Sequence, residues 1–157
     1  MSNHLSKQLK RFSSSSLSRY ILAAILARTS TSASIISIIL LSRQFGADRA
    51  LVGALAACLT APHILGPLYA RWLEKSHHPF ILIAIACVCF VGFFQLAIIS
   101  FTWQSLWLTF VALLFCGACS SFMMGGLSTQ VMSLVENIPT VRRQAQSWDN
   151  FTYGIAL

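Results

Sequence analysis

The sequence predicts an all-α, polytopic transmembrane helix bundle, and three observations lead to that prediction. Of the 157 residues, 56% are hydrophobic and only 10% are charged, whereas soluble domains carry about 25% charged residues. No Asp, Glu, Lys or Arg occurs from Ser76 to Val135. Four apolar stretches also reach the ~20 residues that a bilayer-spanning helix needs. A soluble fold of this composition would expose large apolar patches to water.

The apolar stretches divide the chain into a short tail and a membrane domain. We predict a basic, serine-rich cytoplasmic tail over residues 1–19 and a transmembrane domain over 20–157. Within that domain we expect spans near 20–42, 50–70, 79–101 and 106–128, and the start of a fifth near 145–157. A helix that ended at Leu157 would leave its last carbonyls unsatisfied in hydrocarbon. We therefore expect the sequence to be the front part of a longer protein.

The basic residues indicate the orientation of the chain. Two of them, Arg43 and Arg49, fall in the first connection. Eight fall in the tail and in the second and fourth connections, namely Lys7, Lys10, Arg11, Arg19, Arg71, Lys75, Arg142 and Arg143. The positive-inside rule then places the N-terminus in the cytoplasm, with the chain in the plasma (inner) membrane. Because topology explains the net charge of +7, we expect the lipid bilayer and no nucleic acid as a partner.

The first span contains an arginine, which raises an alternative. A basic lead, a short apolar core and small residues near Ala33 are also features of a signal peptide. However, the apolar run resumes after Arg28 and continues to Leu41. The segment from Arg28 to Arg43 spans only ~22 Å as a helix, less than the ~30 Å hydrocarbon core. We therefore prefer one membrane-spanning helix that includes Tyr20–Ala27 and holds Arg28 inside the membrane.

Arg28 is followed by six residues of which five carry hydroxyls, so nearly two turns of this helix are polar. We expect some hydroxyls to bond carbonyls one turn earlier. Arg28 has two interpretations: its side chain snorkels toward the cytoplasm, or it faces a cavity and pairs with Asp149. Because ionisable residues inside a membrane are functional hypotheses by default, the candidates for a transport path are Arg28, Thr31, Ser34, His63, Gln95 and Asp149.

Small residues recur at four-residue spacing in two spans. Gly117, Ser121 and Gly125 form such a ridge in the fourth span, and Gly53 and Ala57 begin one in the second. Ridges of this kind let helices approach closely, so we expect them to serve helix packing. Pro62 removes a backbone hydrogen bond and is expected to bend the second span.

The five cysteines raise the question of redox or metal chemistry, above all the pair Cys116 and Cys119. With Met123, Met124 and His63 they could complete a soft-metal site. A free cysteine within an apolar helix behaves instead as a small hydrophobe, and redox CxxC motifs belong to soluble βαβ folds. No serine–histidine–acid, zinc or phosphate-loop pattern occurs. We expect no metal, no cofactor and no enzyme activity.

The stretch "GPLYARWLEKSHHP" after the second span resembles a motif of the major facilitator superfamily of secondary transporters. That motif is roughly G-x-L-A-D-R-x-G-R-R and often follows "GPL". In the preferred alignment, Ala70 takes the first glycine, Trp72 the leucine, Glu74 the aspartate and Lys75 the arginine. An alternative frame from Gly66 keeps Arg71 but places Ala70 at the acid. The resemblance implies that the residues of this loop (Ala70, Arg71, Trp72, Glu74 and Lys75) latch a gate.

The resemblance extends over most of the chain. "SRYILAAILARTSTS" is similar to the family's first helix, and "IPTVRRQAQSWDNFTYGIAL" to the start of its fifth. The arginine that drug–proton antiporters often carry in the fourth helix is replaced by Leu113. The chain therefore resembles the N-terminal portion, about four and a half helices, of a six-helix half.

The resemblance implies secondary transport of a small solute by alternating access, in the direction of efflux or uptake, with a coupling ion. Since alternation requires two bundles, the missing C-terminal helices or a partner bundle would be needed. The alternative from another class is a small multi-span scaffold or assembly protein without transport activity.

Overall fold

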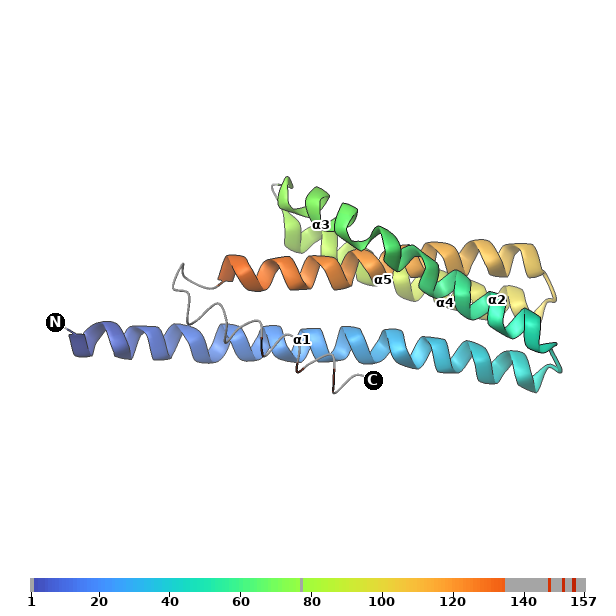
Figure 1. Ribbon diagram of the computed structural model, residues 1–157, viewed down its shortest axis with the longest axis horizontal. Coiled ribbons are helices and arrows are strands. Elements are labelled where there is room, and N and C mark those ends of the chain that lie inside the picture. Colours follow the sequence, from blue (N-terminus) through green and yellow to red (C-terminus); the bar gives the residue numbers. More distant parts are fainter. Residues whose placement is uncertain (1, 77, 135–146, 148–150, 152–153, 155–157) are drawn as a thin grey trace.

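The structure is a computed structural model that describes the backbone of residues 2–76, 78–134, 147, 151 and 154. Side chains are described over residues 21–128, apart from 74 and 77, and at 147, 151 and 154. The elements in chain order are α1 (Ser2–Gln44), α2 (Arg49–Thr60), the 3-10 helix η1 (Ala61–Leu65), α3 (Gly66–Glu74), α4 (Pro79–Thr102) and α5 (Leu106–Leu134) (Figure 1).

The predicted all-α architecture is confirmed for the described part of the chain, which is helical and contains four segments able to cross a membrane by length and composition. These segments are Ile21–Gln44, Arg49–Leu73, Pro79–Thr102 and Leu106–Ser128. They coincide with the four predicted spans to within a few residues at each end. The length and composition of these helices therefore indicate a multi-pass membrane protein.

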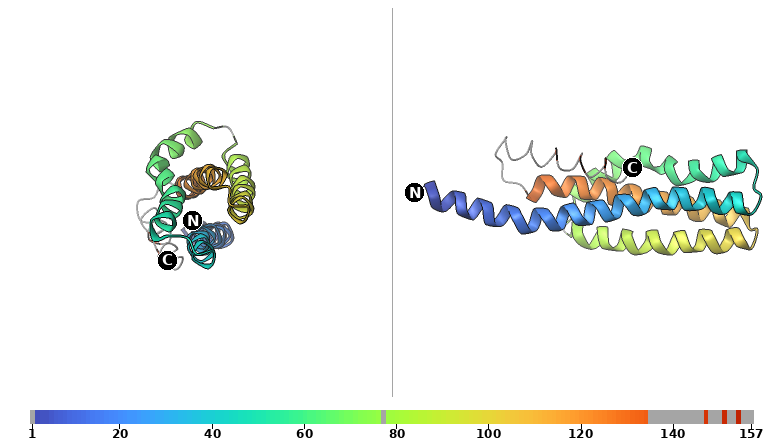
Figure 2. Two further views of the ribbon diagram at one scale, coloured as in Figure 1. Left: turned by 90° about the vertical axis from the view of Figure 1, so that its right-hand side faces the viewer. Right: turned by 90° about the horizontal axis from the view of Figure 1, so that it is seen from below.

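The helices form an up-and-down bundle organised around α5. Contacts join α5 to α1, α2, η1, α3 and α4, and α4 and α5 form the antiparallel hairpin that their short connection predicts (Figure 2). The N-terminus lies at the same end of the bundle as the α3–α4 connection, whereas the α1–α2 and α4–α5 turns share the opposite end (Figure 1). Because successive spans run in opposite directions, Arg71 and Lys75 lie at the same end of the bundle as the N-terminal tail.

The first helix is longer than expected. The predicted boundary between tail and membrane domain at residue 20 is not a helix boundary, because α1 begins at Ser2 and continues without a break to Gln44. No glycine or proline occurs between these two residues, so nothing in the local sequence ends the helix before the membrane segment.

Pro62 interrupts the second span as expected. The α-helix ends at Thr60, a 3-10 turn follows over Ala61–Leu65, and a new α-helix begins at Gly66. A proline lacks the N–H that an α-helical hydrogen bond requires and its ring crowds the preceding turn. The span is therefore two helices joined by a short irregular segment, and this segment lies against α5.

The two turns at the end opposite the tail share one hydrogen-bond pattern. After α1, the Gly46 N–H bonds the Arg43 carbonyl and the Ala47 N–H bonds the Ser42 carbonyl. After α4, the Gln104 N–H bonds the Phe101 carbonyl and the Ser105 N–H bonds the Ser100 carbonyl. This is the Schellman arrangement, which requires a left-handed residue, and here Gly46 (φ 71°) and Gln104 (φ 58°) take that place.

Candidate functional site

The inner face of α1 is unusually polar for a buried surface. Its buried side chains recur every three or four residues, the spacing of one helix face. They are Ala24, Arg28, Thr31, Ser34, Ile38 and Ser42. Four of these six carry a charge or a hydroxyl, so the surface that α1 turns toward α2 and α5 combines packing with hydrogen-bonding groups.

The hydroxyls of this face are satisfied partly within the helix, as expected. Thr31 Oγ1 donates to the Ala27 carbonyl at 3.1 Å, Ser34 Oγ to the Ser30 carbonyl at 2.7 Å, and Ser42 Oγ to the Ile38 carbonyl at 2.6 Å. Ser30, on the outer side, donates to the Ala27 carbonyl at 2.8 Å. Bonds back to the preceding turn let hydroxyls lie in a helix that has no water around it.

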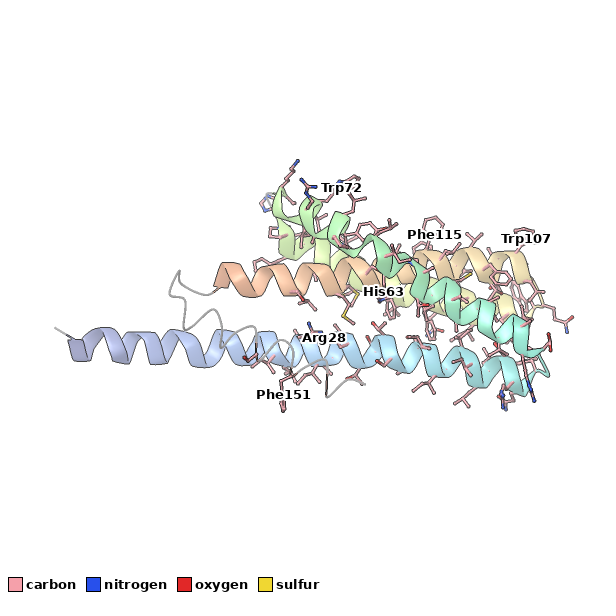
Figure 3. The ribbon with its side chains drawn as sticks, viewed as in Figure 1. Arg28, His63, Trp72, Trp107, Phe115 and Phe151 are labelled. Carbon is pink, nitrogen blue, oxygen red and sulfur yellow. The ribbon has the colours of Figure 1, made fainter. Side chains whose placement is uncertain are left out.

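Arg28 is the one charged side chain that is buried among the described residues, with 1% of its surface exposed. Its Nη2 donates to Ser128 Oγ on α5 at 3.4 Å. Figure 3 shows the side chain projecting from α1 toward the other helices. The structure therefore buries Arg28 within the bundle, in contact with α5. The proposed pair with Asp149 lies outside the described residues.

A chain of hydrogen bonds connects three segments that are far apart in sequence. Ser120 Oγ on α5 lies 3.3 Å from Thr31 Oγ1 on α1 and 3.3 Å from His63 Nε2 on η1. The other ring nitrogen of His63, Nδ1, lies 3.2 Å from the Thr60 carbonyl oxygen at the end of α2. His63 reaches Ser120 because the irregular segment after Pro62 turns the histidine toward α5.

The structure thus brings together four of the six candidates for a transport path. Arg28, Thr31 and Ser34 share the inner face of α1, and His63 lies across from them. Gln95 does not belong to this site, because its side chain on α4 is exposed. Asp149 lies outside the described residues.

The predicted gate-loop residues are helical, which corrects their assignment to a connection. Ala70, Arg71 and Trp72 belong to α3, and the connection to α4 begins at Lys75, its C-cap. The reason is that Gly66 and Pro67 start a new helix at this point, with Pro67 in its first turn. Arg71, Trp72 and Lys75 are exposed at this end of the bundle, while Leu73 is buried. The Glu74 side chain lies outside the described part.

The small residues of the two predicted packing ridges differ in their surroundings within the described chain. A Cβ at Gly117 would collide with the Leu59 carbonyl, and one at Gly125 would come within 3.3 Å of the Gly66 carbonyl oxygen. Ser121 is buried and donates to the Gly117 carbonyl at 2.8 Å. Gly53 and Ala57 are instead exposed, because α2 turns Leu55 and Leu59 inward.

Several residues of the polar interior were not predicted. Ser120 and Ser128 of α5 complete the contacts to α1 and η1, and their spacing of eight residues is compatible with one helix face. The glycine ridge of α5 pointed instead to Ser121, the neighbour of Ser120. Among the described contacts, the Ser121 hydroxyl bonds only a carbonyl of its own helix. A second hydroxyl pair, Ser100 and Thr109 at 3.0 Å, joins α4 to α5 near their turn.

The outer surface differs from this interior in being apolar. A groove of about 490 Å³ lies between η1, α3 and α5, with Pro62, Tyr69 and Phe115 among its lining residues. Trp72, Phe115 and Trp107 project outward (Figure 3). The cysteines are free thiols, and Cys116 Sγ lies 3.7 Å from the Phe90 carbonyl oxygen. Within the described residues, no three His, Cys, Asp or Glu side chains are placed to share a metal ion.

No protein-family model, curated protein or solved structure gives a significant match to this chain. The chemistry available at the site therefore follows from its own residues and their geometry. A buried guanidinium, a histidine and several hydroxyls line the interface of α1, η1 and α5. Such a set can bind a polar or anionic solute or a proton, whereas it offers no activated nucleophile within the described residues.

Proposed function

We propose that this chain is part of a secondary active transporter of the major facilitator type, which moves a small solute across the plasma membrane by alternating access. The observation that carries the proposal is the polar interior built by Arg28, Thr31, His63 and Ser120 within an otherwise apolar bundle. The partner of this bundle would be the C-terminal helices of the complete protein or a second bundle. The N-terminus would lie in the cytoplasm.

The cost of burying Arg28 supports a functional role for it. A charged side chain at the centre of a membrane helix costs about 2.5–3.5 kcal/mol even on the mildest scale. A hydrophobic residue of similar size would pack in the same place without that cost. Selection for packing alone would therefore not retain an arginine here, whereas a binding site for a polar solute requires such a group.

The irregular segment of the second span also supports transport. Irregular backbone at membrane depth is tolerated where it is buried in protein or lines a cavity, and transporter sites often include interrupted helices near the midplane. Here the interruption at Ala61–Leu65 contains His63 and contacts α5. The interruption of the second span and the polar interior therefore lie at the same place in the bundle.

The alternative is a membrane scaffold or assembly protein. The close approach of Gly117 to Leu59 is a feature that favours it, because such contacts stabilise a static bundle. The two functions differ in what they require of Arg28: a scaffold would retain its assembly without the charge, but a transporter would lose its flux.

A flux assay in membrane vesicles distinguishes the two. The gene product would be assayed in its complete encoded form, with a panel of labelled anionic, zwitterionic and cationic solutes. We expect at least one solute to cross faster than in vesicles without the protein, and we expect Arg28→Gln to reduce that flux by tenfold or more. Gln95→Ala is the matched control, because it alters a polar residue exposed on α4, and it should keep the flux.

Two results would contradict the proposal. One is the absence of protein-dependent flux for every solute while the protein is folded in the membrane. The other is a flux that Arg28→Gln and Gln95→Ala leave equally unchanged. Sequencing beyond the codon for Leu157 adds an independent check, since the proposal expects further membrane spans to be encoded there or in a partner.

A further inference from the structure

The hydrogen-bond chain through His63 has an acceptor at each end. It begins at the Thr60 carbonyl, passes through His63 and Ser120 to Thr31, and ends at the Ala27 carbonyl. These atoms make four contacts, between 3.1 and 3.3 Å long. Carbonyl oxygens only accept, so every proton in these contacts must come from the three side chains between them.

The number of protons available depends on the charge of the histidine. Each hydroxyl supplies one proton, and a neutral imidazole supplies one more, from whichever nitrogen carries it. Three protons cannot fill four contacts, so with neutral His63 one contact always brings two acceptors together. An imidazolium supplies two protons. All four contacts are then hydrogen bonds, with Nε2–H donating to Ser120, Ser120 to Thr31, and Thr31 to Ala27.

Several titratable or charged side chains lie on the elements around His63. Arg28 projects from α1 toward the other helices (Figure 3), where it donates to Ser128 of α5. Two thiols lie on α5: Cys116 Sγ contacts the Phe90 carbonyl oxygen of α4, and Cys119 is partly buried. The other charged or titratable side chains described on the elements packed against η1 are Cys58 and the exposed Arg49 of α2, and Tyr69 and the exposed Arg71 of α3; the Glu74 side chain lies outside the described part.

We propose that His63 is a proton-binding site whose protonation links η1, α5 and α1 through Ser120 and Thr31. A hydronium ion transfers its proton to the unprotonated imidazole nitrogen, so that one O–H bond breaks, one N–H bond forms and a water molecule leaves. The hydroxyl protons of Ser120 and Thr31 then reorient along the chain. The gain is one additional hydrogen bond, which completes a chain joining helices that must separate in a transport cycle. The inference rests on the proposed function only in giving this proton the role of coupling ion.

The direct test follows the protonation of His63 without any solute. A variant with His4→Gln, His77→Gln and His78→Gln leaves His63 as the one histidine of the chain. With ¹⁵N-labelled histidine in lipid nanodiscs, nitrogen NMR between pH 8 and pH 5 reports whether each ring nitrogen carries a proton. We expect His63 to change from one protonated nitrogen to two, with both engaged in hydrogen bonds at low pH. In Ser120→Ala, the Nε2 hydrogen bond should be lost while the titration remains.

A distance measurement tests the link between helices. Spin labels attached through a ketone-bearing amino acid at Ile36 of α1 and Ile64 of η1, both exposed, leave the native cysteines in place. We expect the population with the shorter distance to increase about two- to tenfold from pH 8 to pH 5, the equilibrium factor of one net hydrogen bond. Thr31→Ser should keep this response because it keeps the hydroxyl, and Thr31→Val should abolish it.

The control is Ser100→Ala. It removes a buried hydroxyl of the other interhelical pair, which includes no histidine, and should leave the pH response intact. The proposal is overturned if His63 still has a single protonated nitrogen at pH 5, if Ser120→Ala keeps the Nε2 hydrogen bond, or if Thr31→Val shows the same pH-dependent change in distance as the parent chain. Because neither readout requires flux, a failure of the transport assay would leave this result standing, and the reverse also holds.

Discussion

Gly117 of α5 lies against the carbonyl group of Leu59, the next-to-last residue of α2, with no room for a β-carbon between them. The same β-carbon would also come within 3.0 Å of Pro62 Cγ. This close approach of two helices therefore occurs two residues before Ala61–Leu65, the segment that holds His63. One consequence is that the position of η1, and hence of its histidine, depends on a glycine in a different helix.

Gly117→Ala should destabilise the bundle. The new methyl group meets backbone atoms, which cannot move aside as a flexible side chain can, and overpacking of this kind costs about 1–3 kcal/mol. Thermal unfolding in detergent measures the effect. Gly92→Ala is the matched control, because Gly92 is a helical glycine with nothing within 4 Å of its β-carbon position, and alanine there should be neutral or stabilising by up to ~1 kcal/mol. Equal stability of the two variants would contradict the predicted contact.

The turn between α4 and α5 should be stabilised by Gln104→Gly. Gln104 has a φ of 58°, a conformation that costs a residue with a β-carbon about 1 kcal/mol relative to glycine. The corresponding turn after α1 already has glycine, so Gly46→Ala should lower stability by a similar amount. Unfolding midpoints of the two variants should therefore shift in opposite directions, and a shift of the same sign in both would show that the turns are not equivalent.

Arg28→Leu should separate stability from function. A charged side chain at the centre of a membrane helix costs about 2.5–3.5 kcal/mol on the translocon-insertion scale, and an apolar side chain avoids this cost. We therefore expect the variant to unfold at the same or a higher temperature in detergent and yet to lose solute flux in vesicles. A strongly destabilised variant would indicate that Arg28 holds the bundle together, and a stable variant with full flux would remove Arg28 from the transport path.

The sequence predicted the spans well because a bilayer imposes a length and a composition on each helix. It also predicted a bend at Pro62, where the structure has a 3-10 segment between two helices, and the bonds from hydroxyls to carbonyls, which depend on neighbours in the chain. It did not predict the partners Ser120 and Ser128, because the rotation of α5 against α1 depends on contacts between distant residues. For the same reason it could not show that Gly53 turns away from the bundle.

The helical start of the gate motif was missed for a different reason. The predicted span ended near residue 70, and the residues after it were assigned to a polar connection because they include Arg71 and Glu74. A proline in the first turn of a helix is favourable, however, since its missing N–H has no partner there in any case. Pro67 occupies such a position and Pro62 another, so the two prolines restart the span and carry it on to Glu74.

The central claim is that the inner face of α1 becomes accessible to water during a transport cycle, and cysteine labelling in native membranes tests it most directly. Ser34→Cys places a thiol on the inner face and Ile36→Cys places one on the outer face. Membrane-impermeant thiol reagents would be applied to vesicles of each orientation, with site-resolved mass spectrometry to separate these thiols from the five native cysteines. Alternating access predicts that position 34 reacts at least about tenfold faster than position 36, which faces lipid. An unreactive position 34 from both sides of the membrane would contradict the claim and favour a static scaffold.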